Sequence, residues 1–292
     1  MTTSSPIATI VLAEKNANAF ETALGLVPDL LNPTILSDNK AFEGHVPGKV
    51  TQKYLMAALE KAGLQADICV QPVGKRRKEL LICDMDSTLI GQECIDELAD
   101  FAGVKEHVSA ITERAMRGEI GFESALNERV GLLKGLELSF LQKCFDERIR
   151  LNPGARTLCQ TMKANGAKAV IVSGGFTFFT GKVAQACGFD AHQANILIEE
   201  GDHLTGAVGM PILGREAKLE ALKAHSEPFG GPHNSIAIGD GANDLAMITA
   251  AGLGIAFYAK PAVAAAAHCA INYSDLTTAL YFQGYKDSEF VH

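Results

Sequence analysis

Short, almost uninterrupted apolar runs recur from residue 80 onward, and segments rich in helix-forming residues separate them; Ala169-Val170-Ile171-Val172 is typical. Strands that helices cover on both faces have this composition, because neither side of the strand meets water. Strands that alternate with helices pair in parallel, since each crossover returns the chain to the same end of the sheet. The pattern predicts a parallel α/β sheet of Rossmann-like type, with strands at 80–84, 168–173, 194–198, 235–239 and 253–257.

A long segment without strand signals interrupts this alternation after the first strand. Residues 91–150 are rich in charges and helix formers, as in 105–117 and 122–133. An insertion at this point lies over the carboxyl ends of the strands, where open α/β sheets bind their ligands. We therefore expect a helical cap over about 91–150, above a binding site.

The first 74 residues have a different pattern. The predicted elements are strands at 7–12 and 66–73, helices at 16–26 and 51–63, and a weaker extended stretch at 33–46 with a turn at Asp38-Asn39. This β-α-β-β-α-β order favours a small α+β unit of ferredoxin type and is similar to that of ACT-type ligand-sensing modules.

The run Lys75-Arg76-Arg77-Lys78 follows this unit and is interpreted as a solvated linker. The predicted domains are therefore an N-terminal ACT-like domain at 1–74 and an α/β domain with its cap at 80–292.

Composition restricts the compartment and the partners. The 292 residues carry a net charge of −8, so no basic surface for nucleic acid is expected. The seven cysteines are odd in number and include no C-x-x-C pair, which argues against a disulfide framework or a zinc site. The N-terminus lacks the pattern of a signal peptide, and no segment has the roughly 20 apolar residues that span a bilayer. We expect a cytoplasmic protein without a nucleic-acid or membrane partner.

Two carboxylates end the first strand of the predicted α/β sheet. Asp84 and Asp86 are two residues apart, so both side chains project to the same side of an extended chain. Such a pair suits two kinds of chemistry: oxygen ligation of a hard divalent cation, and a nucleophile beside a proton donor. An acidic turn after a buried strand is the alternative, and Asp-x-Asp alone does not decide between them.

Three further polar elements follow along the chain. Ser173-Gly174-Gly175 comes directly after an apolar run, and a hydroxyl beside exposed backbone N–H groups can hold a phosphoryl oxygen. Lys218 lies at the predicted start of a helix. Residues 239–244 (GDGAND) follow another strand and gather two carboxylates and an amide, which are ligands for a hard metal ion. Taken singly, the three have ordinary alternatives: a glycine-rich turn, a surface lysine and an Asp/Asn/Gly turn.

In this order the four elements resemble the four motifs of the haloacid dehalogenase superfamily, over about residues 80–275. The cap adds Glu93, Met116, Phe122 and Arg129, in the order in which the phosphoserine phosphatases of this superfamily carry a Glu, a Met, a Phe and an Arg. The resemblance implies that Glu93 binds the substrate ammonium and Arg129 its carboxylate, while the two apolar side chains close over the site. A guanidinium suits a carboxylate because it donates two parallel hydrogen bonds.

The resemblance further implies Mg²⁺-dependent hydrolysis of O-phosphoserine to serine and phosphate, the last step of serine biosynthesis. In that family pattern Asp84 is the nucleophile that forms an aspartyl-phosphate, and Asp86 is the general acid and base. Mg²⁺ would be held by the Asp84 carboxylate, the Asp86 main-chain carbonyl and Asp240. The remaining motif residues would bind the phosphoryl group or support those that do: Ser173, the Gly174 amide, Lys218 and Asn243 in the first role, and Asp244 in the second.

Two other functions are compatible with the same sequence. One is a phosphatase of the same superfamily for another small phosphomonoester, such as phosphohomoserine. Another is a non-catalytic, amino-acid-sensing regulatory protein, against which the intact set of acidic and lysine motif residues argues. The N-terminal unit lacks a clear glycine-rich ligand loop, so a structural appendage or the contact surface of a homodimer is the alternative to a sensing domain.

Overall fold

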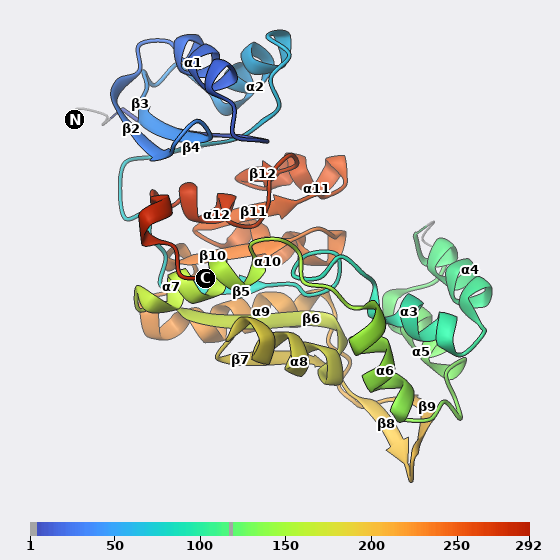
Figure 1. Ribbon diagram of the computed structural model, residues 1–292. Coiled ribbons are helices and arrows are strands. Elements are labelled where there is room, and N and C mark those ends of the chain that lie inside the picture. Colours follow the sequence, from blue (N-terminus) through green and yellow to red (C-terminus); the bar gives the residue numbers. More distant parts are fainter. Residues whose placement is uncertain (1–4, 117–118) are drawn as a thin grey trace.

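A computed structural model describes residues 5–116 and 119–292, without the side chain of Met116. Its strands form a six-stranded sheet, a four-stranded sheet and a two-stranded hairpin, which Figure 1 shows as separate parts of the molecule. No helix in these described ranges is long and apolar enough to cross a membrane.

The six-stranded sheet is parallel throughout, in the order β12-β11-β10-β5-β6-β7. Its strands are β5 (Leu80–Cys83), β6 (Lys168–Phe176), β7 (Ala191–Asn195), β10 (Ser235–Gly239), β11 (Leu253–Phe257) and β12 (Cys269–Ile271). The chain runs outward from β5 in one direction and then from β10 in the other. Ligands bind at such a switch point because the neighbouring connections leave on opposite sides and open a crevice.

Helices cover both faces of this sheet, as the apolar runs predict. They are α7 (Ala155–Ala164), α8 (Thr177–Cys187), α9 (Arg215–Ser226), α10 (Leu245–Ala250), α11 (Pro261–Ala266) and α12 (Thr278–Tyr281). Along β5, Leu81 and Cys83 belong to the hydrophobic cluster that includes α7 and α8. Leu80 and Ile82 belong to the opposite cluster, with α9 and α10. All four side chains of β5 are therefore buried.

The predicted strand at 194–198 is wrong in its boundaries. In the structure β7 ends at Asn195, and β8 (Leu197–Glu200) pairs antiparallel with β9 (His203–Val208) in a separate hairpin. Two of the apolar residues that suggested one strand, Leu197 and Ile198, belong to this hairpin. Leu197 is buried with Leu204 in the core cluster that extends into the cap. The edge strand β7 has exposed central residues and no apolar run, so its sequence carries little strand signal.

Four helices between β5 and β6 form the expected cap: α3 (Cys94–Phe101), α4 (Lys105–Met116), α5 (Phe122–Gly131) and α6 (Ser139–Arg148). The two segments that join the cap to the sheet are hydrogen-bonded to each other. The Gly91 N–H donates to the Arg150 carbonyl at 3.2 Å, and the Asn152 N–H donates to the Leu89 carbonyl at 2.8 Å. The β8–β9 hairpin bonds to the cap through the Leu204 N–H, which donates to a cap carbonyl at 2.9 Å.

The four-stranded sheet belongs to the N-terminal residues and has the order β2-β3-β1-β4, with antiparallel pairs. Its elements are β1 (Ile7–Leu12), α1 (Ala17–Leu26), β2 (Leu31–Ser37), β3 (Ala41–His45), α2 (Gln52–Lys61) and β4 (Ala66–Gln71). Asn16 and Thr51 cap the two helices, because their side chains accept the N–H groups of the first turns. The element order agrees with the expectation, whereas the domain boundaries and an ACT-like role remain predictions.

The basic run after β4 is not the solvated linker that its charge suggests. Arg76 makes two hydrogen bonds to Glu43, at 2.6 and 2.7 Å. Arg77 bonds to Glu289 at 2.7 Å and stacks over the ring of Tyr285. The arginines are therefore paired with acidic partners from distant parts of the chain.

A buried carboxylate joins the N-terminal sheet to the six-stranded sheet. Asp67 of β4 accepts hydrogen bonds from the backbone N–H groups of Asn272, at 2.7 Å, and Ser274, at 3.0 Å. Burial raises the pKa of Asp67, and these donors partly oppose that rise. The contact lies just after β12, beside which β4 runs.

Candidate active site

Asp84 follows β5 directly, at the switch point of the sheet. Its side chain is buried, with Oδ1 accepting the Met85 N–H at 2.7 Å. Its Oδ2 lies 2.6 Å from Nζ of Lys218, which extends from the first turn of α9. The same Nζ lies 2.6 Å from Oδ1 of Asp244, after β10. One lysine therefore joins carboxylates from the ends of two neighbouring strands.

The two carboxylates that contact Lys218 stabilise its charged form. Burial alone lowers the pKa of Lys218, because it disfavours the ammonium form, but the carboxylates of Asp244 and Asp84 raise it above its ordinary value. Lys218 is therefore a permanent cation beneath the cavity floor.

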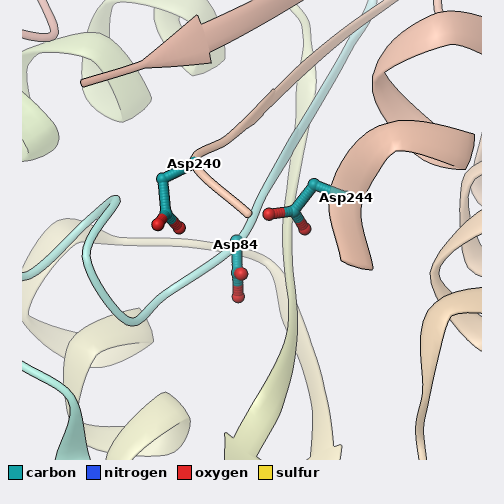
Figure 2. A group of neighbouring side chains, drawn as sticks. All are labelled: Asp84, Asp240 and Asp244. Carbon is teal, nitrogen blue, oxygen red and sulfur yellow. The ribbon is translucent and has the colours of Figure 1, made fainter. Parts of the chain in front are cut away.

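Three carboxylates converge where β5 and β10 end (Figure 2). Oxygens of Asp84, Asp240 and Asp244 lie within 4.8 Å of one another. Burial, together with the charge of Asp84, raises the pKa of Asp240 to about 6 and that of Asp244 to about 7. These raised values mean that Lys218 offsets only part of the local negative charge. A divalent cation with oxygen ligands fits this donor set, so the group can hold a metal ion.

Asp86 lies outside that group of three. Its Oδ1 accepts the Cys94 N–H at 3.1 Å, at the start of α3. Burial, together with the charge of Glu93, raises the pKa of Asp86 to about 8. A carboxyl group with this pKa is largely protonated at neutral pH and can donate a proton to a reacting atom.

A glycine without a predicted role makes room for this carboxyl. A Cβ at Gly175 would lie only 2.5 Å from Oδ2 of Asp86, so a larger residue there would displace this carboxyl group. The Gly175 N–H donates to Oγ of Ser173 at 3.0 Å. Asn195, at the end of β7, donates from Nδ2 to the Gly174 carbonyl at 2.8 Å and so fixes the orientation of this glycine turn. Sequence reasoning missed Asn195 because it lies outside every motif.

The cap places Arg129 and Phe122 on α5. Arg129 donates from Nε to the Ala125 carbonyl at 3.2 Å and from Nη1 to Oγ1 of Thr112 at 3.5 Å. The ring of Phe122 lies over the glycine turn: a Cβ on Gly174 would lie 3.4 Å from its Cζ. Met116 ends α4, and its side chain lies outside the described residues.

Glu93 precedes α3 and accepts a hydrogen bond from Oγ of Ser87 at 2.7 Å. Partial burial by the surrounding protein raises the pKa of Glu93 to about 7, and the charges of Asp240 and Asp84 contribute to this rise. Ser87 has a φ of 53°, a left-handed conformation that turns the chain sharply after the two aspartates.

A cavity of about 660 Å³ separates the cap from the sheet. The predicted site residues in its wall are Asp84, Asp86, Glu93, Phe122, Arg129, Ser173, Gly174, Asp240 and Asn243. Lys218 and Asp244 are buried directly behind Asp84. The wall also contains Ser87, Asp96, Thr112 and Gly175, to which the sequence assigned no role.

Known proteins share both the sequence and the arrangement. The haloacid dehalogenase-like hydrolase family matches residues 81–249. The phosphoserine phosphatase of Streptomyces coelicolor is 44% identical over 85% of this chain, which spans 62% of that protein's length. The phosphoserine phosphatase of a Polaromonas species is 43% identical over 72% of this chain and 92% of its own length.

Two solved structures extend the comparison. A hydrolase of the haloacid dehalogenase family from Salmonella enterica serovar Typhi superposes with a TM-score of 0.85 at 30% identity, over 95% of this chain and 97% of that one. A phosphoserine phosphatase solved as a phospho-aspartyl intermediate analogue has a TM-score of 0.65 at 40% identity, over 70% of this chain and 99% of that one. The chain therefore belongs to the haloacid dehalogenase-like hydrolases and, within them, to the phosphoserine phosphatase family.

Proposed function

We propose that this chain hydrolyses O-phosphoserine to serine and phosphate with the help of Mg²⁺. The observation that carries the proposal is the cavity between sheet and cap. The sheet contributes Asp84 and the Ser173 turn, and the cap contributes Arg129 and Glu93. Phosphoserine has a phosphate, a carboxylate and an ammonium group, and this wall offers a counterpart of suitable charge or hydrogen-bonding capacity for each.

In the proposed reaction Asp84 attacks phosphorus, and the bond from phosphorus to the serine oxygen breaks as an aspartyl-phosphate forms. Asp86 gives its proton to the departing oxygen, in keeping with a pKa of about 8. In the second step Asp86 takes a proton from the water that attacks the intermediate, which releases phosphate and restores Asp84.

The remaining motif residues hold the phosphoryl group. Ser173, the Gly174 amide and Asn243 donate hydrogen bonds to its oxygens, and Lys218, paired with Asp84, orients that carboxylate for attack. Bound Mg²⁺, held by Asp84, Asp240 and the Asp86 main-chain carbonyl, would supply positive charge against the repulsion between these carboxylates and the phosphate.

Removal of divalent metal is expected to stop phosphate release. EDTA should reduce the rate to the background of the assay, and an excess of Mg²⁺ should restore it, because the carboxylates otherwise repel the phosphate. A phosphate assay before and after restoration measures this. Full activity in EDTA would contradict the metal assignment.

Arg129→Ala is expected to lower kcat/KM for phosphoserine by about 100-fold, since two charge-assisted hydrogen bonds to the carboxylate are lost. The loss on phosphoethanolamine, which has no carboxylate, should be below about threefold. Arg148→Ala is the matched control, because Arg148 pairs with Glu97 and Asp100 of α3 and does not line the cavity. Equal losses on both esters would remove carboxylate recognition. A wild-type preference for phosphohomoserine would favour the alternative substrate.

We also propose a cytoplasmic homodimer. The seven cysteines are buried and unpaired, which suits a reducing compartment.

The edge strand β2 exposes Leu31 and Ile35, and exposed apolar side chains on an edge strand favour pairing with another copy. Sedimentation equilibrium should give twice the mass of one chain. The substitution Ile35→Asp should lower the measured mass toward that of one chain, because it places a charge on the proposed contact surface. A monomer at micromolar concentration would contradict the dimer.

A further inference from the structure

Among the described residues Asp96 has no hydrogen-bond or ion-pair partner for its side chain, although it lies in the wall of the cavity. Its Oδ1 is buried and is the one buried side-chain oxygen or nitrogen in the described residues without a hydrogen bond. Its other oxygen is in no hydrogen bond or ion pair of the described residues either. A carboxylate that is partly desolvated and unpaired is costly, so a missing partner is the simplest reason for its retention.

The position of Asp96 indicates what that partner is. It lies one helical turn after Glu93, in the first turn of α3, so the two carboxylates are neighbours on the cap side of the cavity. One oxygen of Glu93 is already occupied by the Ser87 hydroxyl. An ammonium group has three N–H donors, and Glu93 alone leaves some of them without an acceptor.

Arg129 lies nearby but does not take this role. Among the charges that affect its pKa, that of Asp96 has the largest effect, so the two groups are close. They nevertheless form no ion pair within 4.0 Å, and the bonds of Arg129 go to a backbone carbonyl and a hydroxyl. A guanidinium and a carboxylate that share one cavity without an ion pair between them suit the two charges of a zwitterion.

We propose that Asp96 is a second acceptor for the substrate ammonium, beside Glu93, and that it contributes to selection of amino-acid phosphates. The inference rests on the proposed function, because it concerns the same cavity. It assigns to Asp96 a contact that neither the motifs nor the family resemblance assigned.

Three esters separate this role from a structural one. Phosphoserine has both charges, phosphoethanolamine lacks the carboxylate, and 3-phosphohydroxypropionate lacks the ammonium. For Asp96→Asn we expect kcat/KM to fall about 10- to 100-fold on the first two esters, through KM, because one charge-assisted hydrogen bond is lost. On the third ester kcat/KM should not fall and should rise slightly, because a negative charge near the carboxylate of this ester is removed.

Matched variants complete the experiment. Glu97→Gln, on the next residue of α3, is the control, because Glu97 faces Arg148 and not the cavity. Asp96→Glu keeps the charge and should retain more activity on the ammonium esters than Asp96→Asn. A thermal melt of each variant reports any loss of helix stability, which would affect all three esters alike.

Two results would overturn the role of Asp96. An equal loss on all three esters would mean that Asp96 supports the fold or the nucleophile, and a loss confined to the carboxylate esters would mean that it acts through Arg129. Wild-type protein that hydrolyses the ammonium-free ester as well as phosphoserine would instead overturn the proposed substrate. The ammonium contact has its own test in that case: it is rejected when the ratio of kcat/KM for phosphoserine to kcat/KM for the ammonium-free ester is the same in Asp96→Asn as in the wild type.

Discussion

Asp84→Asn is expected to reduce phosphate release by about 10⁴-fold or more, the range found when a covalent nucleophile is removed. An amide oxygen is a far weaker nucleophile than a carboxylate, and it cannot form a stable acyl phosphate. The fold should survive, because the amide keeps the shape of the side chain and can still accept from the Met85 N–H. Steady-state phosphate release measures the loss.

The control for this variant is Asp146→Asn, at an exposed position of α6, where the Asp146 carboxylate accepts from Gln142 and its backbone carbonyl accepts from Arg150. That variant should keep full activity. A quench of the wild-type reaction with radiolabelled substrate should trap label on the protein, and Asp84→Asn should trap none. Label of equal amount in both proteins would place the nucleophile elsewhere.

Lys218→Met is expected to have the largest effect on stability, because it leaves the buried carboxylates of Asp84 and Asp244 without their cation. Removal of one partner from a buried ion pair costs about 3–5 kcal/mol in the free energy of unfolding. Activity should fall by about 10³-fold, because without the lysine the Asp84 carboxylate is no longer held in place and is repelled by the neighbouring carboxylates. Chemical denaturation and phosphate release measure the two effects.

The stability deficit of Lys218→Met should depend on pH. Burial and the charge of Asp84 already raise the pKa of Asp244 to about 7, above its value in the unfolded chain. A carboxyl with a raised folded pKa binds more protons in the folded state, so stability falls as pH rises. The deficit should therefore be smaller at pH 5 than at pH 8. Lys223→Met, on an exposed position of the same helix, is the control and should change neither property. A deficit independent of pH would contradict the electrostatic explanation.

The β8–β9 hairpin and the ion pairs of the basic run after β4 show why some of the fold escaped prediction. The segment 194–198 has apolar residues, and periodicity cannot tell whether they face a parallel sheet or a separate hairpin. The basic run after β4 looks solvated, since its partners Glu43 and Glu289 are distant in sequence. In both cases the deciding contact joins residues that no local window contains.

By itself the sequence determined the α/β class, the helical cap after the first strand and the position of each polar motif at the end of a strand or the start of a helix. These properties are local, because burial of a strand is visible in its apolar run and a turn in its glycines and aspartates. Only the tertiary structure decided that Lys218 joins Asp84 to Asp244 and that Asp86 has a pKa of about 8. It also decided that Asn195 orients the glycine turn and that Asp96, whose buried Oδ1 has no hydrogen bond from the described residues, lies near Arg129. Desolvation and charge interactions depend on which strands and helices become neighbours in space, and the strand order that sets this is a property of the folded chain.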